Sequence, residues 1–246
     1  FKTIMISKGI FGIGCSYMWG EGLYYYSNLP DLPEKGLHHY FDEENILDTH
    51  NAFKNKHRFI QLVSDHYNVW NWTFGNGFNM NGGSNIRSFN DLMFMFNEEY
   101  KLTPNHFSLF IYQFTAPTRD QIDGSGGGGE YYPIEQQIQS VYDNMKRFID
   151  SNVKIVTINW YKEIANHPLY KKLFSDFHCD IEVDGVIKES FDYFVEDDKY
   201  KCSLRSDFYP PYLENDTHLN IKGHRCVADS IIKKLEKDKF NPKDYE

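Results

Sequence analysis

The feature that most limits the fold of this sequence is a set of four short apolar runs. Each run is followed by a segment with helical periodicity. The runs lie near residues 8–13, 68–74, 107–113 and 153–160. Strands that alternate with helices in this way form parallel sheets, because each helix carries the chain back across a face of the sheet. We therefore predict an α/β protein whose parallel sheet has helices on both faces.

The segments between the apolar runs place apolar residues at helical spacing. Helices are predicted at 57–67, 86–100, 133–150, 161–174 and 221–237, with a possible break in the fourth at Pro168. The segment 179–191 instead predicts a hairpin that turns at Asp184-Gly185. From about Tyr24 to Asn51 the periodicity is lost, which favours an excursion over the surface, and the glycine-rich stretch 124–129 predicts a loop.

The charge balance argues against nucleic acid as a partner. The 246-residue chain has 35 acidic and 26 basic residues, which gives a net charge of −9. Binding to a phosphate backbone depends on clustered cations. No apolar run approaches the ~20 residues of a membrane span, so the sequence predicts a soluble protein of one large domain. The sequence begins at Phe1 and not at a methionine, so it is compatible with a preceding secretory segment.

The spacing of cysteines and histidines gives no sign of a metal or cofactor site. None of the four cysteines forms a Cys-x-x-Cys pattern. Cys179 and Cys202 could pair if the protein meets an oxidising compartment. His38 and His39 are adjacent, but no third ligand follows at helical spacing. We expect neither a metal nor a cofactor.

A serine follows the first apolar run in a glycine-rich turn, Gly14-Cys15-Ser16. Glycines around a single hydroxyl are typical of a nucleophilic serine held on a sharp turn after a strand. So short a pattern is also common in ordinary tight turns. A serine is too weakly acidic to attack unaided, so it needs a base within hydrogen-bond reach.

A candidate base lies about two hundred residues further on, just before the last predicted helix. Asp216 and His218 are two positions apart. In an extended segment, residues i and i+2 project to the same side, so the carboxylate can lie beside the imidazole. Asp216 could instead be a helix-capping or turn carboxylate. The sequence therefore indicates a Ser16, Asp216, His218 triad.

At this point the sequence resembles the SGNH, or GDSL-type, hydrolase family. The resemblance is closest to viral and bacterial members with a Gly-Cys-Ser-(aromatic)-x-Trp-Gly motif, a Gly-Gly-Ser-Asn loop and an arginine-bearing turn after the third strand. It implies a single domain over residues 1–246, with insertions near 24–55 and 178–212. It also implies a flavodoxin-like three-layer α/β/α fold with a central parallel sheet.

The resemblance assigns roles to these residues. Ser16 would be the nucleophile, His218 the base and Asp216 the group that orients it. The oxyanion hole would use the N–H groups of Ser16 and Gly83 and a third donor from a side chain. The usual Gly-x-Asn-Asp motif is absent, and Asn85 is favoured as the third donor.

Gln113 and Thr115 are the alternatives to Asn85 as the third donor. Arg119 and Thr115 are predicted to bind substrate, although Arg119 could form a structural ion pair with Asp120 or another carboxylate. His224 fits a family position on the final helix and is expected to be structural, with the role of base in place of His218 as the alternative. Cys15 is expected to be a small buried residue.

The sequence thus predicts a serine esterase that removes a small acyl group, such as acetyl, from a glycan or a small molecule. An acyltransferase with the same triad is one alternative. A non-catalytic glycan-binding or virion structural protein of the same fold is another. The aromatic share of 17% indicates either an aromatic-rich core or platforms for sugars. The bias toward Asn, Lys, Tyr and Phe is typical of AT-rich genomes, viral ones included. The sequence does not indicate the cellular compartment of the protein.

Overall fold

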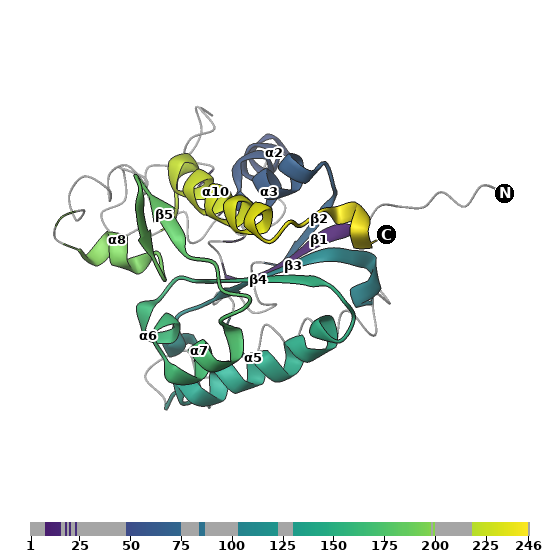
Figure 1. The fold of residues 1–246 in the computed structure, drawn as a ribbon. Coiled ribbons are helices and arrows are strands. Elements are labelled where there is room, and N and C mark those ends of the chain that lie inside the picture. The colour runs from purple at the N-terminus through teal and green to yellow at the C-terminus, as the bar shows by residue number, and fades with distance from the viewer. Residues whose placement is uncertain are drawn as a thin grey trace.

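A four-stranded parallel sheet lies at the centre of the protein (Figure 1). This computed structural model describes residues 8–15, 18, 20, 23, 48–74, 84–86, 103–122, 130–197, 199 and 218–245. The strands are β1 (Gly9–Ile13), β2 (Asn71–Phe74), β3 (Phe107–Phe114) and β4 (Lys154–Asn159). Each neighbouring pair is parallel, so the prediction of a parallel sheet from these four runs is confirmed.

The strands follow the order β2-β1-β3-β4 across the sheet. The chain therefore moves from β1 to one side and then returns to place β3 on the other side of β1. A single parallel bridge between Thr157 and His178 continues the sheet beyond β4. There the N–H of Thr157 donates to the carbonyl of Phe177, and the N–H of Cys179 donates to the carbonyl of Thr157.

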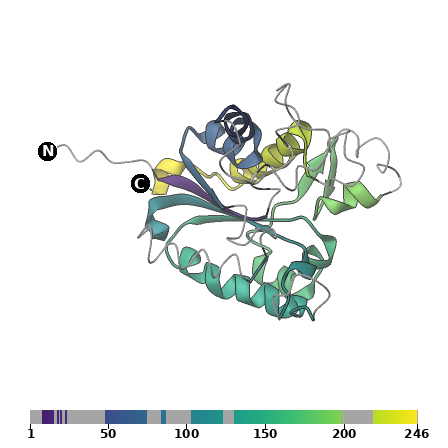
Figure 2. The ribbon, with the colours of Figure 1, turned by 180° about the vertical axis from the view of Figure 1, so that it is seen from behind.

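Helices cover both faces of the sheet and give three layers (Figures 1 and 2). One face carries α3 (Phe59–Tyr67) and α10 (Ile221–Lys237), with α2 (Asp48–His57) beside them. The opposite face carries α5 (Ile134–Ile149), α6 (Lys162–Ala165) and α7 (Pro168–Phe174). The coarse α/β prediction is thereby confirmed.

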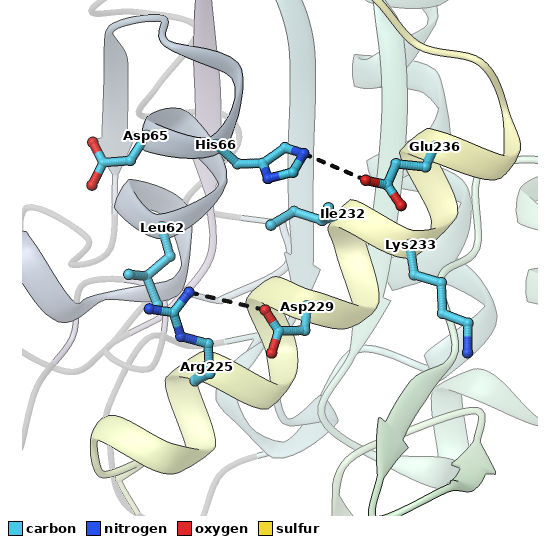
Figure 3. Close-up of a pocket in the computed structure, with 8 residues that line it drawn as sticks. All are labelled: Leu62, Asp65, His66, Arg225, Asp229, Ile232, Lys233 and Glu236. Atoms are coloured by element: carbon cyan, nitrogen blue, oxygen red, sulfur yellow. Dashed lines mark ion pairs between the residues drawn. The ribbon is translucent and has the colours of Figure 1, made fainter.

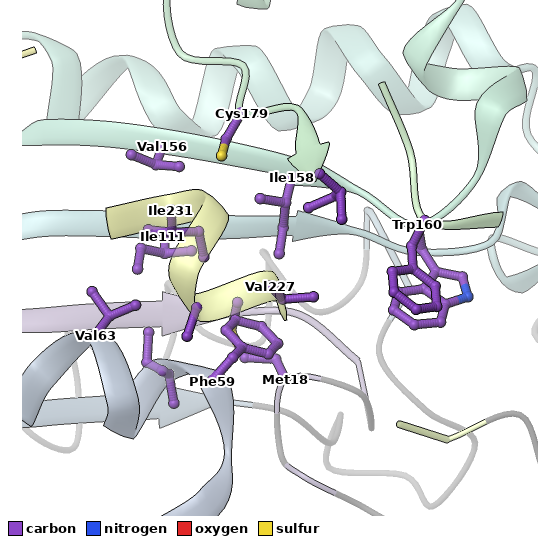
Figure 4. Packing of buried hydrophobic residues seen from close by; sticks show 14 of the residues in the cluster. Met18, Phe59, Val63, Ile111, Val156, Ile158, Trp160, Cys179, Val227 and Ile231 are labelled. Carbon is purple, nitrogen blue, oxygen red and sulfur yellow. The ribbon is translucent and has the colours of Figure 1, made fainter. Parts of the chain in front are cut away.

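Alternate residues of β1, β3 and β4 enter two separate cores, as the period of a strand requires. Ile111 and Val156 face α10, where they belong to one buried cluster with Val227 and Ile231 (Figure 4). On the other face Phe110 stacks on Phe148 of α5, with ring centroids 4.4 Å apart. Because these strands are buried on both faces, their sequences are nearly continuous apolar runs.

Local signals set several element boundaries. Pro168 begins α7, where its missing N–H costs no hydrogen bond, so the predicted break in this helical segment is confirmed. The predicted hairpin is also confirmed, as β5 (Ile181–Val183) and β6 (Val186–Lys188). Its turn uses Asp184 with a φ of 49° and Gly185 with a φ of 80°, the left-handed backbone that such turns need.

Two short helices were not predicted. The first is α2, which begins at Asp48 and so overlaps the end of the expected surface excursion over 24–51. The second is α8 (Asp192–Glu196), which follows the hairpin. α2 was missed because its sequence lacks an apolar stripe, so contact with α3 rather than amphipathicity supports it. Three 3-10 turns complete the described elements: η4 (Pro104–His106), η5 (Pro117–Arg119) and η6 (Pro242–Tyr245).

Other predicted segments lie outside the described residues. These are 24–47, most of the helix over 86–100 and the glycine stretch 124–129. Among the helices that are described, none is both long enough and apolar enough to cross a membrane.

Candidate functional site

The carboxyl ends of β1 and β3 lie side by side where the strand order reverses. Ile13, the last residue of β1, pairs with Tyr112 near the end of β3. In open α/β sheets, ligands bind in the crevice at such a switch point. β1 leads directly into Gly14 and Cys15, and Cys15 is buried. Ser16 is the next residue in the chain and lies outside the described residues.

Gln113 packs against this turn from the end of β3. Its Nε2 donates a hydrogen bond to Sγ of Cys15 at 3.2 Å, and its Oε1 has no hydrogen-bond partner among the described residues. A Cβ built on Gly14 would lie 2.8 Å from Cβ of Gln113 and 3.0 Å from Cβ of Met18. Glycine is therefore needed at position 14 because the backbone passes so close to Gln113.

His218 lies three residues before the start of α10 and is partly exposed. Asn220 caps the helix by accepting the N–H of Gly223 on its side-chain oxygen at 3.0 Å. Leu219 is fully buried and belongs to the same cluster as Cys15 and Met18. The segment with the candidate base and the turn with the candidate nucleophile thus contribute to one core. Asp216 lies outside the described residues.

His224 is completely buried between α10 and α3. Its Nδ1 accepts the backbone N–H of Phe59 at 3.2 Å, so Nδ1 carries no proton. This bond supplies the cap that Arg58, the N-cap residue of α3, does not provide with its own side chain. Burial, together with the nearby charges of His218, Arg58 and His57, lowers the pKa of His224 to about 3. A neutral, helix-capping histidine fits the structural role expected from the sequence.

The predicted oxyanion donor Asn85 is fully buried, and its side-chain amide is engaged inside the protein. Its Nδ2 donates to the carbonyl of Thr115 at 3.3 Å and to Oε1 of Gln137 at 2.9 Å. Its Oδ1 accepts the N–H of Thr115 at 2.9 Å. Both amide hydrogens are in use, so an oxyanion could bind Asn85 only by displacing one of these bonds. Gly83 lies outside the described residues.

Asp120 holds the backbone of the same segment. Its two carboxylate oxygens accept the N–H groups of Asn85 at 2.8 Å and Ile86 at 2.9 Å, and Ser84 adds a side-chain hydrogen bond. Burial raises the pKa of the Asp120 carboxyl, while these hydrogen bonds act in the opposite direction. Because the carboxylate serves backbone donors, the Arg119–Asp120 ion pair left open by the sequence does not form among the described residues.

The two predicted substrate residues have different surroundings. Thr115 is only 1% exposed, and its peptide group is paired with Asn85, so it belongs to the interior. Arg119 is partly exposed at the end of η5, and its Nη1 is buried without a hydrogen-bond partner in the described part of the chain. Burial raises the pKa of the Tyr161 hydroxyl, which follows β4, and the positive charge of Arg119 acts in the opposite direction.

Only some of the cysteine and histidine residues considered from the sequence lie among the described residues. Cys179 is a free, buried thiol whose pKa burial raises to about 12, and Cys202 lies outside the described residues. Within the described ranges, no three His, Cys, Asp or Glu side chains are arranged to hold a metal ion. His38 and His39 are not among those ranges.

An open surface pocket of about 660 Å³ lies elsewhere, between α3 and α10 (Figure 3). Leu62 and Ile232 supply its apolar lining. Polar and charged side chains supply the rest, with Nε2 of His66 lying 3.5 Å from a carboxylate oxygen of Glu236. None of the lining residues is among the predicted site residues, so this pocket does not mark the proposed chemistry.

The roles of Gln137 and of Asp120, which bind Asn85 and its backbone, were not predicted from the sequence. Gln137 was detectable, because it lies on the apolar stripe of α5 with Val141, Met145 and Phe148. A polar residue at a core position of a helix needs a buried hydrogen-bond partner. The partner itself, 52 residues away at Asn85, was not detectable.

No protein-family model matches this sequence, and a search of curated proteins also finds no match. The case for a function therefore comes from the residues and their arrangement.

Proposed function

We propose that this protein is a serine hydrolase of flavodoxin-like architecture that cleaves an ester. The observation that carries the proposal is the place of the Gly14-Cys15 turn, which leads into Ser16 directly after β1 at the switch point. The strand order β2-β1-β3-β4 equals the first four positions of the flavodoxin order 2-1-3-4-5. The bridge at His178 lies where the fifth strand would begin.

The proposed reaction forms an acyl-enzyme. Oγ of Ser16 attacks the ester carbonyl while Nε2 of His218 takes its proton, and Asp216 stabilises the resulting imidazolium. His218 then returns the proton to the leaving alcohol. A water molecule, deprotonated by His218, then attacks the acyl-enzyme, and His218 returns this proton to Oγ of Ser16 as the carboxylic acid leaves. The backbone N–H groups of Ser16 and Gly83 would stabilise the oxyanion, a contribution of about 3–4 kcal/mol for each donor.

Two features of the described residues support this assignment of roles. Leu219, next to His218, shares a buried cluster with Cys15 and Met18 on either side of the Ser16 turn. His224 is neutral and its Nδ1 is occupied by Phe59, which leaves His218 as the better candidate base.

For the substrate we propose an acetyl or similar small acyl ester of a carbohydrate. The sequence resemblance suggests the acyl group. Arg119, in η5 just after the carboxyl end of β3, adds a cation with a buried donor that has no partner among the described residues, which suits a substrate rich in oxygen. Hydrolysis and transfer of the acyl group to a sugar hydroxyl would share every step up to the acyl-enzyme.

Labelling with a fluorophosphonate, followed by peptide mass spectrometry, tests the proposal. We expect one adduct on Ser16 in the unmodified protein and none in Ser16→Ala or His218→Ala. Both variants should lose turnover of p-nitrophenyl acetate while keeping a nearly unchanged melting temperature. Full activity in Ser16→Ala would refute the proposal.

A non-catalytic glycan-binding protein is the second candidate, and the buried amide of Asn85 favours it. The resemblance implies a third oxyanion donor, and both amide hydrogens of Asn85, the residue favoured for it, are bonded to Thr115 and Gln137. Binding on a glycan array that persists in Ser16→Ala, with no adduct and no turnover in the unmodified protein, would support this candidate over hydrolysis.

A further inference from the structure

The buried carboxylate of Asp120 accepts two consecutive backbone N–H groups, those of Asn85 and Ile86. It lies 35 residues away from Asn85 in the sequence and is 1% exposed. A buried carboxylate is unfavourable unless hydrogen bonds compensate the loss of water. Here both oxygens have a backbone donor within 2.9 Å, so the charge fixes the path of residues 84–86.

The side chain of Asn85 fixes the same segment from a second direction. Its amide bonds to both backbone polar groups of Thr115. Oδ1 accepts the N–H of Thr115, and Nδ2 donates to the Thr115 carbonyl. Gln137 accepts the other Nδ2 hydrogen and donates to the carbonyls of Pro117 and Tyr132. The segment 84–86 is thereby attached to the carboxyl end of β3 and to α5.

Gly83 is bonded covalently to Ser84, the first residue of this segment. In the proposed hydrolase the N–H of Gly83 stabilises the oxyanion, and such a donor works only when it lies about 3 Å from the oxygen that becomes charged. We propose that Asp120 is a positioning residue, which fixes the 84–86 segment at the end of β3 and so holds the Gly83 N–H in place. The inference rests on the proposed function, and Asp120 itself touches no substrate.

Asp120→Asn is the first test. The carboxylate has one oxygen for each of the two backbone N–H groups, and the amide of asparagine keeps only one oxygen. With p-nitrophenyl acetate, kcat should fall by about 10- to 100-fold, while KM changes by less than about twofold, because an oxyanion donor acts mainly in the transition state. Hydrogen exchange at the Asn85 and Ile86 amides should become at least about tenfold faster.

Asp192→Asn is the matched control. Asp192 is also a buried carboxylate that accepts a backbone N–H, from Lys162 at 2.9 Å, and a serine hydroxyl, from Ser190. It holds the start of α6 and makes no described contact with residues 84–86. We expect a comparable loss of thermal stability in Asp192→Asn, but a kcat within about twofold of the unmodified protein.

Gln137→Met is a second variant that loosens the same segment through Asn85 and leaves Asp120 in place. It should reproduce the selective loss of kcat to a smaller extent, so the inference stays testable if Asp120→Asn does not fold. An unchanged kcat in a folded Asp120→Asn protein with faster exchange at Asn85 would overturn the inference. Equal losses of kcat in Asp120→Asn and Asp192→Asn would do the same, since they would indicate a general loss of stability.

The labelling experiment separates this inference from the proposed function. If the unmodified protein gives neither a Ser16 adduct nor turnover, the hydrolase proposal fails and this inference fails with it. If the adduct forms at the same rate in the unmodified protein and in Asp120→Asn, the hydrolase proposal stands and only the positioning role of Asp120 is refuted.

Discussion

Replacing His224 by glutamine should make the stability of this protein less sensitive to acid. His224 is fully buried, and its Nδ1 accepts the N–H of Phe59. Burial, and then the nearby charges of His218, Arg58 and His57, lower its pKa to about 3 from the usual 6.5. The folded protein therefore keeps this imidazole neutral in a pH range where the unfolded chain binds a proton.

The sign of the effect follows from proton binding. Below about pH 6.5 the unfolded state takes up a proton on His224 and the folded state does not, so the free energy of unfolding falls as the pH falls. The loss amounts to about 1.4 kcal/mol for each pH unit and ends near the folded pKa. Between about pH 7 and about pH 5, this one group should cost about 2 kcal/mol of stability.

Glutamine can still offer an oxygen to the N–H of Phe59, but it does not titrate. At about pH 7 we expect His224→Gln to be less stable by about 1–3 kcal/mol, because the new side chain fits the buried site less well. By about pH 5 the difference should shrink by about 2 kcal/mol, since only the unmodified protein loses the contribution of His224.

Urea unfolding of both proteins at the two pH values measures this change. Gly14→Ala is the control, because it should destabilise the folded protein by a similar amount without removing a titratable group. The control should keep the pH dependence of the unmodified protein. If His224→Gln differs from the unmodified protein by the same free energy at both pH values, then His224 is not held neutral as described.

Three further outcomes are expected. Gly14→Ala should lower the free energy of unfolding by about 1–3 kcal/mol in urea titrations, because its Cβ would lie 2.8 Å from Cβ of Gln113. Phe110→Ala should cost about 3–5 kcal/mol by the same measurement, since it removes a buried ring that stacks on Phe148 at 4.4 Å. Cys179 should react with a thiol reagent only after unfolding, because burial raises the pKa of its thiol to about 12; rapid labelling of the native protein at Cys179 would contradict its buried position.

The strands were predictable because their signal is local. β1 and β3 are buried at every position and mostly apolar, and this occurs when helices cover both faces of a sheet. Pro168 and Asp184-Gly185 marked a helix start and a turn through their backbone preferences. α2 lacked such a signal, because a helix without an apolar stripe depends on its neighbours.

The surroundings of the candidate site residues were much less predictable. Asn85 looked like a donor available to a ligand, yet its amide bonds to Thr115 and Gln137 in the interior. Asp120 looked like a partner for Arg119, yet its carboxylate holds backbone N–H groups. A polar residue type indicates that a hydrogen bond is available, but it does not indicate which partner the fold will bring to it.

The sequence by itself determined which segments become strands and that the Ser16 turn follows the first of them. Those properties depend on side-chain periodicity and on backbone preferences over a few residues. Only the tertiary structure decided that His224 caps a helix that begins 165 residues earlier, and that Asp120 fixes a segment 35 residues before it. Such contacts form when distant elements pack, and their geometry depends on the whole arrangement of sheet and helices.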